Sequence, residues 1–565
     1  MNQSLISKCV ALGLSAMMLT STATPSFADA GAYLATRQAS LGRDYKEQAF
    51  YAQKALVNDP QNVALLETLI SAKVSMGAFD EALGAAITLK SLDPDNQLAA
   101  IVLIESYAQA GEWDKLLKEL DTGEGISKII DGLTRAWVYI GKGDVTAALQ
   151  EFDKFEASAE GLSFFGPYNR ALALAMVGDF EGGLEILDDP DMPQLGGIIF
   201  ARVHMLSQLD RNDEALVLID EAFGPTNDPL IATLVDLMET GNPLPFTIVR
   251  SAQDGIAEVF SAVAEMLTGE MDDSYTLLYA RTALSLRSDR ATYAFSVANI
   301  LERLGHYDLA IDVYDKIDPK SPIYYVGELG RAEAFRAQDK TEAEIEILRS
   351  LYKTHSDLPE VAVSLGDAMR RGERYKEAIE AYSTALAMTP EPTVAQWPLF
   401  FTRGIAYERS DQWDKAEADF RKALELRPAQ PQVLNYMGYS FVEMNTNLDE
   451  AMSMIRAAVA ARPNDGFITD SLGWGLYRLG QFEQAVAPME KAAALLPVDP
   501  IINDHLGDVY WAVGREREAK FQWTRALSFE PEEKDAARIR EKLAVGLDQV
   551  LINEGAEPTR VAIDG

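Results

Sequence analysis

The feature of this sequence that most constrains its fold is an internal period marked by proline. Prolines follow the ends of apolar segments at Pro60 and Pro94, and again at Pro428, Pro463, Pro497 and Pro531. Within each set, the gap between neighbouring prolines is the same to within one position. A fixed period of roughly 34 residues is the signature of an array of stacked structural units. The 565 residues therefore need not divide into three or four globular domains.

Each period is predicted to form a hairpin of two helices. In residues 503–529, apolar residues follow helical spacing in two bursts, 505–511 and 518–523, with Gly514 between them. Small residues recur at one place on each helix: Gly404, Gly438, Gly473 and Gly507 on the first, and Ala416, Ala451, Ala485 and Ala519 on the second. Helices approach to about 8 Å only where side chains are small, so these residues mark the crossing inside each hairpin. Gly480 and Gly514 suit the left-handed residue that ends a first helix.

These residues resemble the tetratricopeptide repeat family. Gly404, Tyr407, Ala416, Phe420, Ala423 and Pro428 match its consensus, with Phe400 at the leading aromatic position and Arg403 in place of the usual Leu. The pattern returns in Leu472, Gly473, Ala485, Ala492 and Pro497, and in Leu506, Gly507, Tyr510, Ala519, Ala526 and Pro531. The resemblance implies an all-α fold, a right-handed superhelix of stacked hairpins. Weaker matches upstream give roughly a dozen hairpins between residues 31 and 532.

The chain is expected to divide into a leader and two stretches of repeats. Residues 31–224 form a degenerate N-terminal array, and residues 256–532 form the C-terminal array, with the best repeats in 359–531. Residues 225–255, rich in Pro and Gly, are either a linker or a degenerate unit that bends the array, and the apolar stretch 230–238 favours the second. Residues 533–552 are expected to form one charged capping helix, and residues 553–565 a frayed tail.

Residues 1–30 have the pattern of a secretory signal peptide. Lys8 precedes a short apolar run, and the segment ends in small residues that place cleavage near Ala28 or Ala30. A membrane anchor is the alternative, but the run is shorter than the roughly 20 apolar residues that span a bilayer. Cys9 precedes the apolar run, whereas a lipidated cysteine would follow it. We therefore expect an exported, periplasmic protein without an integral membrane span, peripheral to the envelope at most.

Composition and motifs exclude several classes of function. The chain has 51 Lys and Arg against 87 Asp and Glu, a net charge of −36 that would repel nucleic acid. It contains no phosphate loop, no His-Glu-x-x-His motif and no Gly-x-Ser-x-Gly motif. Its four His are scattered over separate repeats. We expect no catalytic residues, no metal site and no cofactor, and interpret the chain as a non-enzymatic protein.

A binding role then rests on the first helices of the hairpins, which line the concave face of a repeat array. The positions that project away from the second helix are predicted to bind protein: Asn435, Tyr439, Asp470, Trp474, Tyr477, Arg478, Asp508, Trp511 and Arg515. Aromatic residues and Arg among polar groups are typical of interface hot spots. The alternative is that Trp474 and Trp511 pack between neighbouring hairpins.

The resemblance also bears on the partner. Chaperone-binding members of the family hold a terminal carboxylate with Lys and Asn, but Asp470, Trp474, Asp504 and Asp508 occupy the corresponding positions here. A basic or apolar protein segment is therefore the expected partner. Residues 466–527 resemble long exported bacterial tetratricopeptide proteins, including a lipoprotein that delivers a carboxyl-terminal processing protease to cell-wall hydrolases. This resemblance implies a protease adaptor at the envelope. The alternative is a structural assembly factor for outer-membrane or exopolysaccharide biogenesis or secretion.

Overall fold

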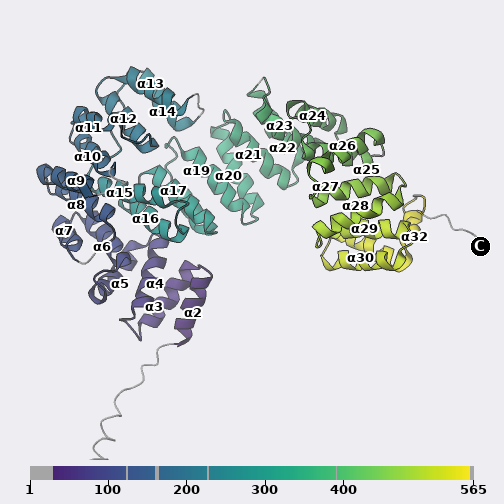
Figure 1. Cartoon of the computed structure of the whole chain (residues 1–565), viewed down its shortest axis with the longest axis horizontal. Helices are drawn as coiled ribbons and strands as arrows, with labels where there is room; N and C mark the ends of the chain where they lie inside the picture. Colours follow the sequence, from purple (N-terminus) through teal and green to yellow (C-terminus); the bar gives the residue numbers. More distant parts are fainter. Residues whose placement is uncertain (1–29, 123–124, 159–163, 225–227, 390, 560–565) are drawn as a thin grey trace, which may run out of the picture. The chain divides into compact units, whose positions relative to one another are not determined.

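A computed structural model describes residues 30–122, 125–158, 164–224, 228–389 and 391–559 of the chain. Over these ranges the regular secondary structure is entirely helical, with consecutive helices paired into hairpins (Figure 1). The prediction of an all-α fold of stacked hairpins is therefore confirmed for the described residues. The chain forms two compact units, one up to Ile347 and one from Leu348. The expected signal peptide, residues 1–30, lies outside the described residues except for Ala30.

The helices of the first unit precede the division, which falls inside α20 (Thr341–Thr354). They are α2 (Ala30–Leu41), α3 (Tyr45–Leu56), α4 (Val63–Ser75), α5 (Phe79–Leu92), α6 (Gln97–Ala110), α7 (Trp113–Leu120), α8 (Lys128–Gly141), α9 (Val145–Ser158), α10 (Phe165–Met176), α11 (Phe180–Leu187), α12 (Gly196–Gln208), α13 (Asn212–Phe223), α14 (Pro229–Glu239), α15 (Ala252–Leu267), α16 (Asp273–Leu286), α17 (Ala291–Arg303), α18 (Tyr307–Tyr314) and α19 (Tyr324–Arg336).

The second unit contains the best matches to the repeat pattern. Its helices are α21 (Pro359–Arg371), α22 (Tyr375–Ala387), the short 3-10 helix η1 (Val394–Gln396), α23 (Trp397–Arg409), α24 (Trp413–Leu426), α25 (Pro431–Glu443), α26 (Leu448–Ala461), α27 (Gly466–Arg478), α28 (Phe482–Leu495), α29 (Pro500–Ala512), α30 (Glu516–Ser528), α31 (Glu533–Val545) and α32 (Leu547–Asn553).

The small residues predicted to mark the hairpin crossings lie where the two helices touch. A Cβ added to Gly404 would lie 2.6 Å from Phe420 Cε1, and one added to Gly507 would lie 2.4 Å from Trp523 Cδ1. The same close approach occurs at Gly473, where a Cβ would lie 2.3 Å from Met489 Sδ. The large residues that fill the crossing, Phe420 and Trp523, are fully buried. These glycines are therefore required by space inside each hairpin, as the period predicted.

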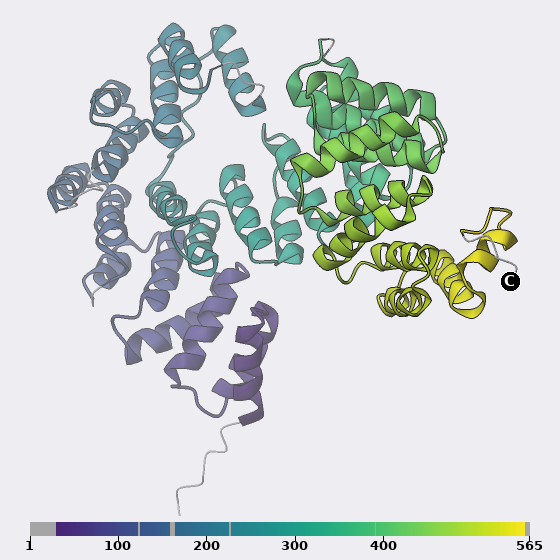
Figure 2. The ribbon, with the colours of Figure 1, turned by 45° about the vertical axis from the view of Figure 1, so that its right-hand side comes forward.

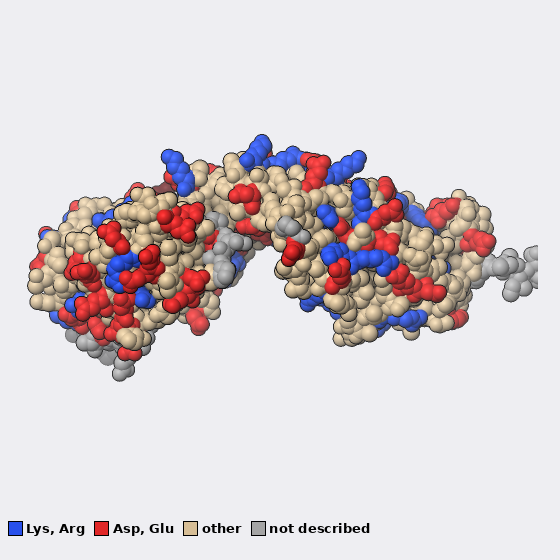
Figure 3. Space-filling model, turned by 90° about the horizontal axis from the view of Figure 1, so that it is seen from above, with Lys and Arg blue, Asp and Glu red and all other residues tan. Residues whose placement is uncertain are grey.

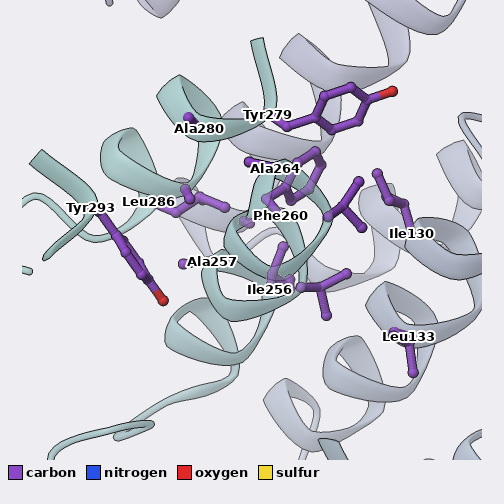
Figure 4. Close-up of a cluster of buried hydrophobic side chains, with 14 of the residues drawn as sticks. Ile130, Leu133, Ile256, Ala257, Phe260, Ala264, Tyr279, Ala280, Leu286 and Tyr293 are labelled. Atoms are coloured by element: carbon purple, nitrogen blue, oxygen red, sulfur yellow. The ribbon is translucent and has the colours of Figure 1, made fainter. Parts of the chain in front are cut away.

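The first unit departs from a simple array, in which each hairpin would touch only its neighbours. Helix α15 packs against α8, and α16 packs against α4 and α6, which precede them by several hairpins (Figures 1 and 2). Figure 4 shows Ile256 and Phe260 of α15 directed toward Ile130 and Leu133 of α8. The Phe260 and Ile256 side chains are fully buried in this contact.

Buried polar contacts accompany this long-range packing. The Arg281 guanidinium of α16 donates to the backbone oxygen of Ser75 over 2.9 Å, and burial lowers the pKa of Arg281 to about 10. Glu105 of α6 accepts a hydrogen bond from the Ser285 hydroxyl over 2.6 Å, and burial raises the pKa of its carboxyl to about 7. Because both side chains are removed from water, the contacts of α16 with α4 and α6 are part of the folded core.

The irregular stretch 225–255 lies inside the first unit. Helix α14 is followed by a non-helical segment up to Ser251. Side chains of α12 hold this segment: the Ser207 hydroxyl accepts from Leu244 N over 2.8 Å, and Gln208 Nε2 donates to Leu244 O over 2.6 Å. Arg287, at the end of α16, donates to the backbone oxygens of residues 247 and 248. The division between the two units comes several helices later, inside α20.

The C-terminal segment forms two helices where a single capping helix is expected. Helix α31 ends at Val545, and Gly546, with φ +85°, turns the chain into α32. A Cβ at Gly546 would lie 2.6 Å from Trp511 Cζ2, so the break lets the backbone approach the Trp511 ring. The prediction of one continuous helix over residues 533–552 is therefore wrong in this detail. Among the described helices, none is long and apolar enough to cross a bilayer.

Candidate functional site

The predicted binding residues lie on or beside the first helices of three consecutive hairpins, α25, α27 and α29. The side chains of α25, α27 and α29 that point away from the second helices are called here the first-helix face. Asp470 is the central carboxylate of this face and Trp474 its central aromatic residue. Asp470 is 7% exposed and Asp508 is 1% exposed, whereas Trp474 and Trp511 are half-buried. The face is thus more enclosed than projection from single helices predicts, because each first helix covers part of the one before it.

Trp474 links the three first helices. Its indole N–H donates to Glu443 Oε1 of α25 over 2.6 Å, and its ring stacks on the His505 ring of α29 with centroids 3.9 Å apart. The Tyr477 ring, within α27, also stacks on Trp474, with centroids 4.8 Å apart. Arg478 completes the contact with α25 through an ion pair of 3.2 Å to Glu443. These contacts are packing between neighbouring repeats, which the sequence left open as the alternative for Trp474.

His505 forms a buried ion pair with Asp470. Its Nδ1 lies 3.1 Å from both carboxylate oxygens of Asp470. Burial on its own lowers the pKa of the His505 imidazole, but the Asp470 carboxylate and the nearby Asp504 and Asp508 outweigh burial, and the pKa lies above its ordinary value. The protonated imidazole is therefore the form that the fold favours.

The stability of the second unit should fall as pH rises through the raised pKa of His505. A group whose folded pKa exceeds its unfolded value of about 6.5 stabilises the fold below that value and loses the effect at higher pH. The variant Asp470→Asn should lose this pH dependence, because the neutral amide does not favour the imidazolium. Urea unfolding at pH 6 and pH 9 measures the difference. Asp449→Asn, an exposed position on α26, is the matched control. Equal pH dependence in Asp470→Asn and the wild type would contradict the assignment.

Asp508 and Trp511 face the C-terminal helices instead of solvent. The Lys542 ammonium of α31, which is fully buried, lies 2.7 Å from Asp508 and 2.8 Å from Asp504. The Trp511 indole N–H donates to Asp548 Oδ2 of α32 over 2.8 Å. Helices α31 and α32 thus occupy the place of a further hairpin, and the contact of Trp511 with α32 is of the kind that the sequence left open as its alternative.

The other predicted residues divide between two places. Asn435 and Tyr439 are half-buried on α25, and the Asn435 carboxamide oxygen accepts no hydrogen bond within the described ranges. Burial, followed by the carboxylates of Glu443 and Asp470, raises the pKa of Tyr439 above its usual range. Arg515 does not join this group: its guanidinium stacks on Tyr510, 3.9 Å from the ring centroid, and pairs with Glu490 of α28 over 2.9 Å.

Two exposed apolar residues of the first-helix face were not predicted from the sequence. Phe467, in the first turn of α27, is 59% exposed, and Ile501, in the first turn of α29, is 38% exposed. They occupy the same position in consecutive repeats. The signal that could have found them is an apolar residue directly after the start of a first helix, where packing inside the hairpin does not need it.

The charge around this site is largely acidic and mostly neutralised within the fold. Glu443, Asp470, Asp504 and Asp508 are each partnered by an Arg, His or Lys. On the face that Figure 3 draws, Asp and Glu side chains lie with Lys and Arg side chains among them. Exposed apolar side chains, and not free buried charges, are what the first-helix face offers a partner.

Comparison with known proteins identifies the repeats. Residues 397–430 match the family model described as tetratricopeptide repeat. The chain is also 25% identical over 195 residues to the TPR repeat-containing protein PA4667 of Pseudomonas aeruginosa, a match that spans 34% of this chain and 32% of the relative. This chain thus covers about a third of that relative's length. The resemblance to tetratricopeptide repeats is confirmed by these matches.

Solved structures with similar folds include a tetratricopeptide repeat protein from Parabacteroides merdae, at 17% identity and a TM-score of 0.40, which covers 46% of this chain and 98% of that chain. MamA from Desulfovibrio magneticus is similar at 18% identity and a TM-score of 0.28, covering 31% of this chain and 96% of that chain.

Proposed function

We propose that this tetratricopeptide repeat protein is a non-catalytic periplasmic scaffold that uses the first-helix face to hold a basic or apolar segment of a partner protein. The repeats support a protein-binding role, because stacked hairpins commonly present an extended surface to other proteins. The observation that carries the proposal is the pair of exposed apolar side chains, Phe467 and Ile501, on the face that also holds the Glu443 carboxylate.

The position of these residues fits the chemistry of such a segment. Exposed aromatic side chains near the centre of a surface supply most of the binding energy in many interfaces. Glu443 is 41% exposed at its side chain, so a Lys or Arg of the partner can compete with Arg478 for its carboxylate. An acidic chain also speeds the encounter with a basic segment.

Export and a role as an adaptor for an envelope protease extend the proposal. The pattern of residues 1–30 supports export, and the resemblance of residues 466–527 to long exported tetratricopeptide proteins supports the adaptor role. In this role, the chain brings substrates and protease together and takes no part in the cleavage chemistry.

Replacing Phe467 by Ala should weaken partner binding about fivefold or more, which corresponds to the cost of more than about 1 kcal/mol that defines an interface hot spot. Phe521→Ala is the matched control, because Phe521 is 68% exposed on the second helix α30 and away from the first-helix face. Partner recovery from the envelope fraction, quantified by mass spectrometry, gives the comparison. Equal recovery with both variants would show that the first-helix face is not the binding surface.

The adaptor role has its own test. The wild-type chain should recover a protease together with the substrates of that protease in stoichiometric amounts, whereas an assembly factor should recover biogenesis or secretion components. The mass of the mature chain in the periplasmic fraction should correspond to cleavage near Ala28 or Ala30. A cytoplasmic pool that retains Met1 would contradict export.

A further inference from the structure

The first unit contains a cavity of about 440 Å³ that the sequence does not predict. It lies where α12, α14, α17 and the loop before α19 meet the non-helical segment after α14. Apolar side chains make much of its wall: Phe200, Leu230, Leu234, Ile248 and Ile323. It lies far along the chain from the first-helix face, so a ligand bound there is independent of the proposed function.

Two cations without an ion-pair partner line this cavity. Arg290 and Lys320 are within ion-pair distance of no carboxylate among the residues that the structure describes. The Arg290 Nε is buried and has no hydrogen-bond partner there. In a chain with a net charge of −36, most described Arg side chains pair with a carboxylate, as Arg250 does with Asp254. An unpartnered guanidinium beside an apolar wall is an unsatisfied group that an anion can complete.

The start of α17 adds hydrogen-bond donors at the same place. Arg290 is the residue before the helix, and no side chain caps the first turn. Ala291 and Thr292, the first two residues of α17, line the cavity beside Arg290. The first N–H groups of a helix have no acceptor within the helix and carry a partial positive charge. The cation and the helix start therefore point to the same kind of ligand.

The carboxylates and the imidazole that also line the cavity are already engaged or neutral. Asp289 pairs with Arg250 over 2.8 Å and with Arg287 over 3.5 Å. Asp318 accepts a hydrogen bond from the backbone N–H of Lys320 over 2.9 Å. Nδ1 of His204 lies 3.1 Å from Pro245 O, and burial lowers the pKa of His204 to about 4, so the ring is neutral at physiological pH. The carboxylates of Asp289 and Asp318 repel a second negative charge and so disfavour a dianion, whereas a ligand with one negative charge can bind at Arg290.

The wall of the cavity is fixed by contacts that do not use these two cations. Arg287 holds the backbone of residues 247 and 248, and Ser207 and Gln208 hold Leu244. Ile248 and Leu234 are buried at 4% and 8% exposure. The apolar wall is therefore formed before any ligand arrives, which lowers the cost of binding.

We propose that this cavity binds a carboxylate that carries an apolar body, with the carboxylate at Arg290, Lys320 and the start of α17 and the apolar body against Phe200, Leu234 and Ile323. Two sources supply this chemistry: the carboxyl terminus of a chain that ends in an aliphatic residue, and a free aliphatic acid. Both present one negative charge and an apolar group of a size that fits the cavity.

Calorimetric titration of the purified chain with four probes tests the proposal: octanoate, octanol, N-acetyl-Ala-Leu and its C-terminal amide. At least one acid should bind at least tenfold more tightly than its neutral counterpart, because the charge-assisted hydrogen bonds to the carboxylate are lost in the alcohol or the amide. Binding of octanoate alone identifies a free acid as the source, and binding of N-acetyl-Ala-Leu alone identifies a chain terminus.

Two pairs of variants locate the binding. Arg290→Gln should weaken the acid about tenfold, while Arg37→Gln, an exposed Arg on α2, removes the same charge and should leave binding unchanged. Lys320→Gln with Lys316→Gln as its control provides a second comparison should Arg290→Gln disturb folding, which circular dichroism reports. Absence of binding by both acids, equal affinity for acid and neutral probe, or binding that neither Arg290→Gln nor Lys320→Gln weakens would overturn the proposal.

Discussion

Replacing Lys542 by Met should destabilise the second unit by about 3 to 5 kcal/mol at neutral pH, the usual cost of leaving a buried charge without its partner. The Lys542 side chain is 0% exposed, and its ammonium lies between the carboxylates of Asp504 and Asp508 at 2.8 and 2.7 Å. Met keeps the length of the side chain and a good helix propensity, so the lost charge dominates the effect. The free energy of unfolding from urea titration measures it, and hydrogen exchange in α31 shows where the fold opens.

The pH dependence of this variant distinguishes lost charge from lost packing. Burial and the neighbouring Asp508 raise the pKa of Asp504, and Lys542 opposes them. A carboxyl group with a raised folded pKa is tolerated below its unfolded pKa and disfavoured as pH rises through the folded value. The loss in Lys542→Met should therefore shrink in acid. A loss that is equal at acid and neutral pH would indicate a packing defect.

Two further variants complete the test of Lys542. Lys534→Met, at an exposed position of the same helix, should change stability by less than about 0.5 kcal/mol. Adding Asp504→Asn and Asp508→Asn to Lys542→Met should recover much of the lost stability, because no buried charge then remains without a partner. Failure of this rescue would mean that the ion cluster is not the source of the loss.

Gly255→Ala should destabilise the first unit by about 3 kcal/mol, at the upper end of the cost of overpacking a core. A Cβ at Gly255 would lie 2.1 Å from Trp137 Cδ2, and the Trp137 ring is fully buried. The ring cannot move aside easily, because its indole N–H donates to Asn169 Oδ1 over 2.9 Å and Asn169 in turn donates to Phe165 O. Separation of α15 from α8 is the expected structural result, measured by urea unfolding and by hydrogen exchange in the two helices.

Gly84→Ala is the matched control for this prediction. Gly84 is exposed within α5, and a Cβ there meets nothing within 4 Å. Ala favours the helix over Gly by roughly 0.5 to 1 kcal/mol, so this variant should be slightly more stable than the wild type. If Gly255→Ala shifted stability in the same direction as Gly84→Ala, the close contact between α15 and Trp137 would be refuted.

Much of the second unit could be predicted from its sequence because the information is local. Gly404 meets Phe420, and Gly507 meets Trp523, at the same spacing along the chain, from the first helix of a hairpin to its second. The spacing of small and large residues therefore gives both the helices and their crossing. The same periodicity places the candidate site on the right helices. It does not predict how deeply the side chains of the site are buried. Whether Asp508 faces solvent depends on Lys542 of α31, a helix that follows the last repeat and lies outside the repeat pattern.

The sequence by itself determined the period, the hairpins and the class of the fold. Only the tertiary structure decided that α15 and α16 return to α8, α4 and α6, and that Arg290 is left beside an apolar cavity. The physical reason is that helical periodicity reports which face of a helix is apolar, but not which distant helix covers that face. The contact between Gly255 and Trp137 joins two residues that several hairpins separate along the chain, and no local spacing specifies such a pair.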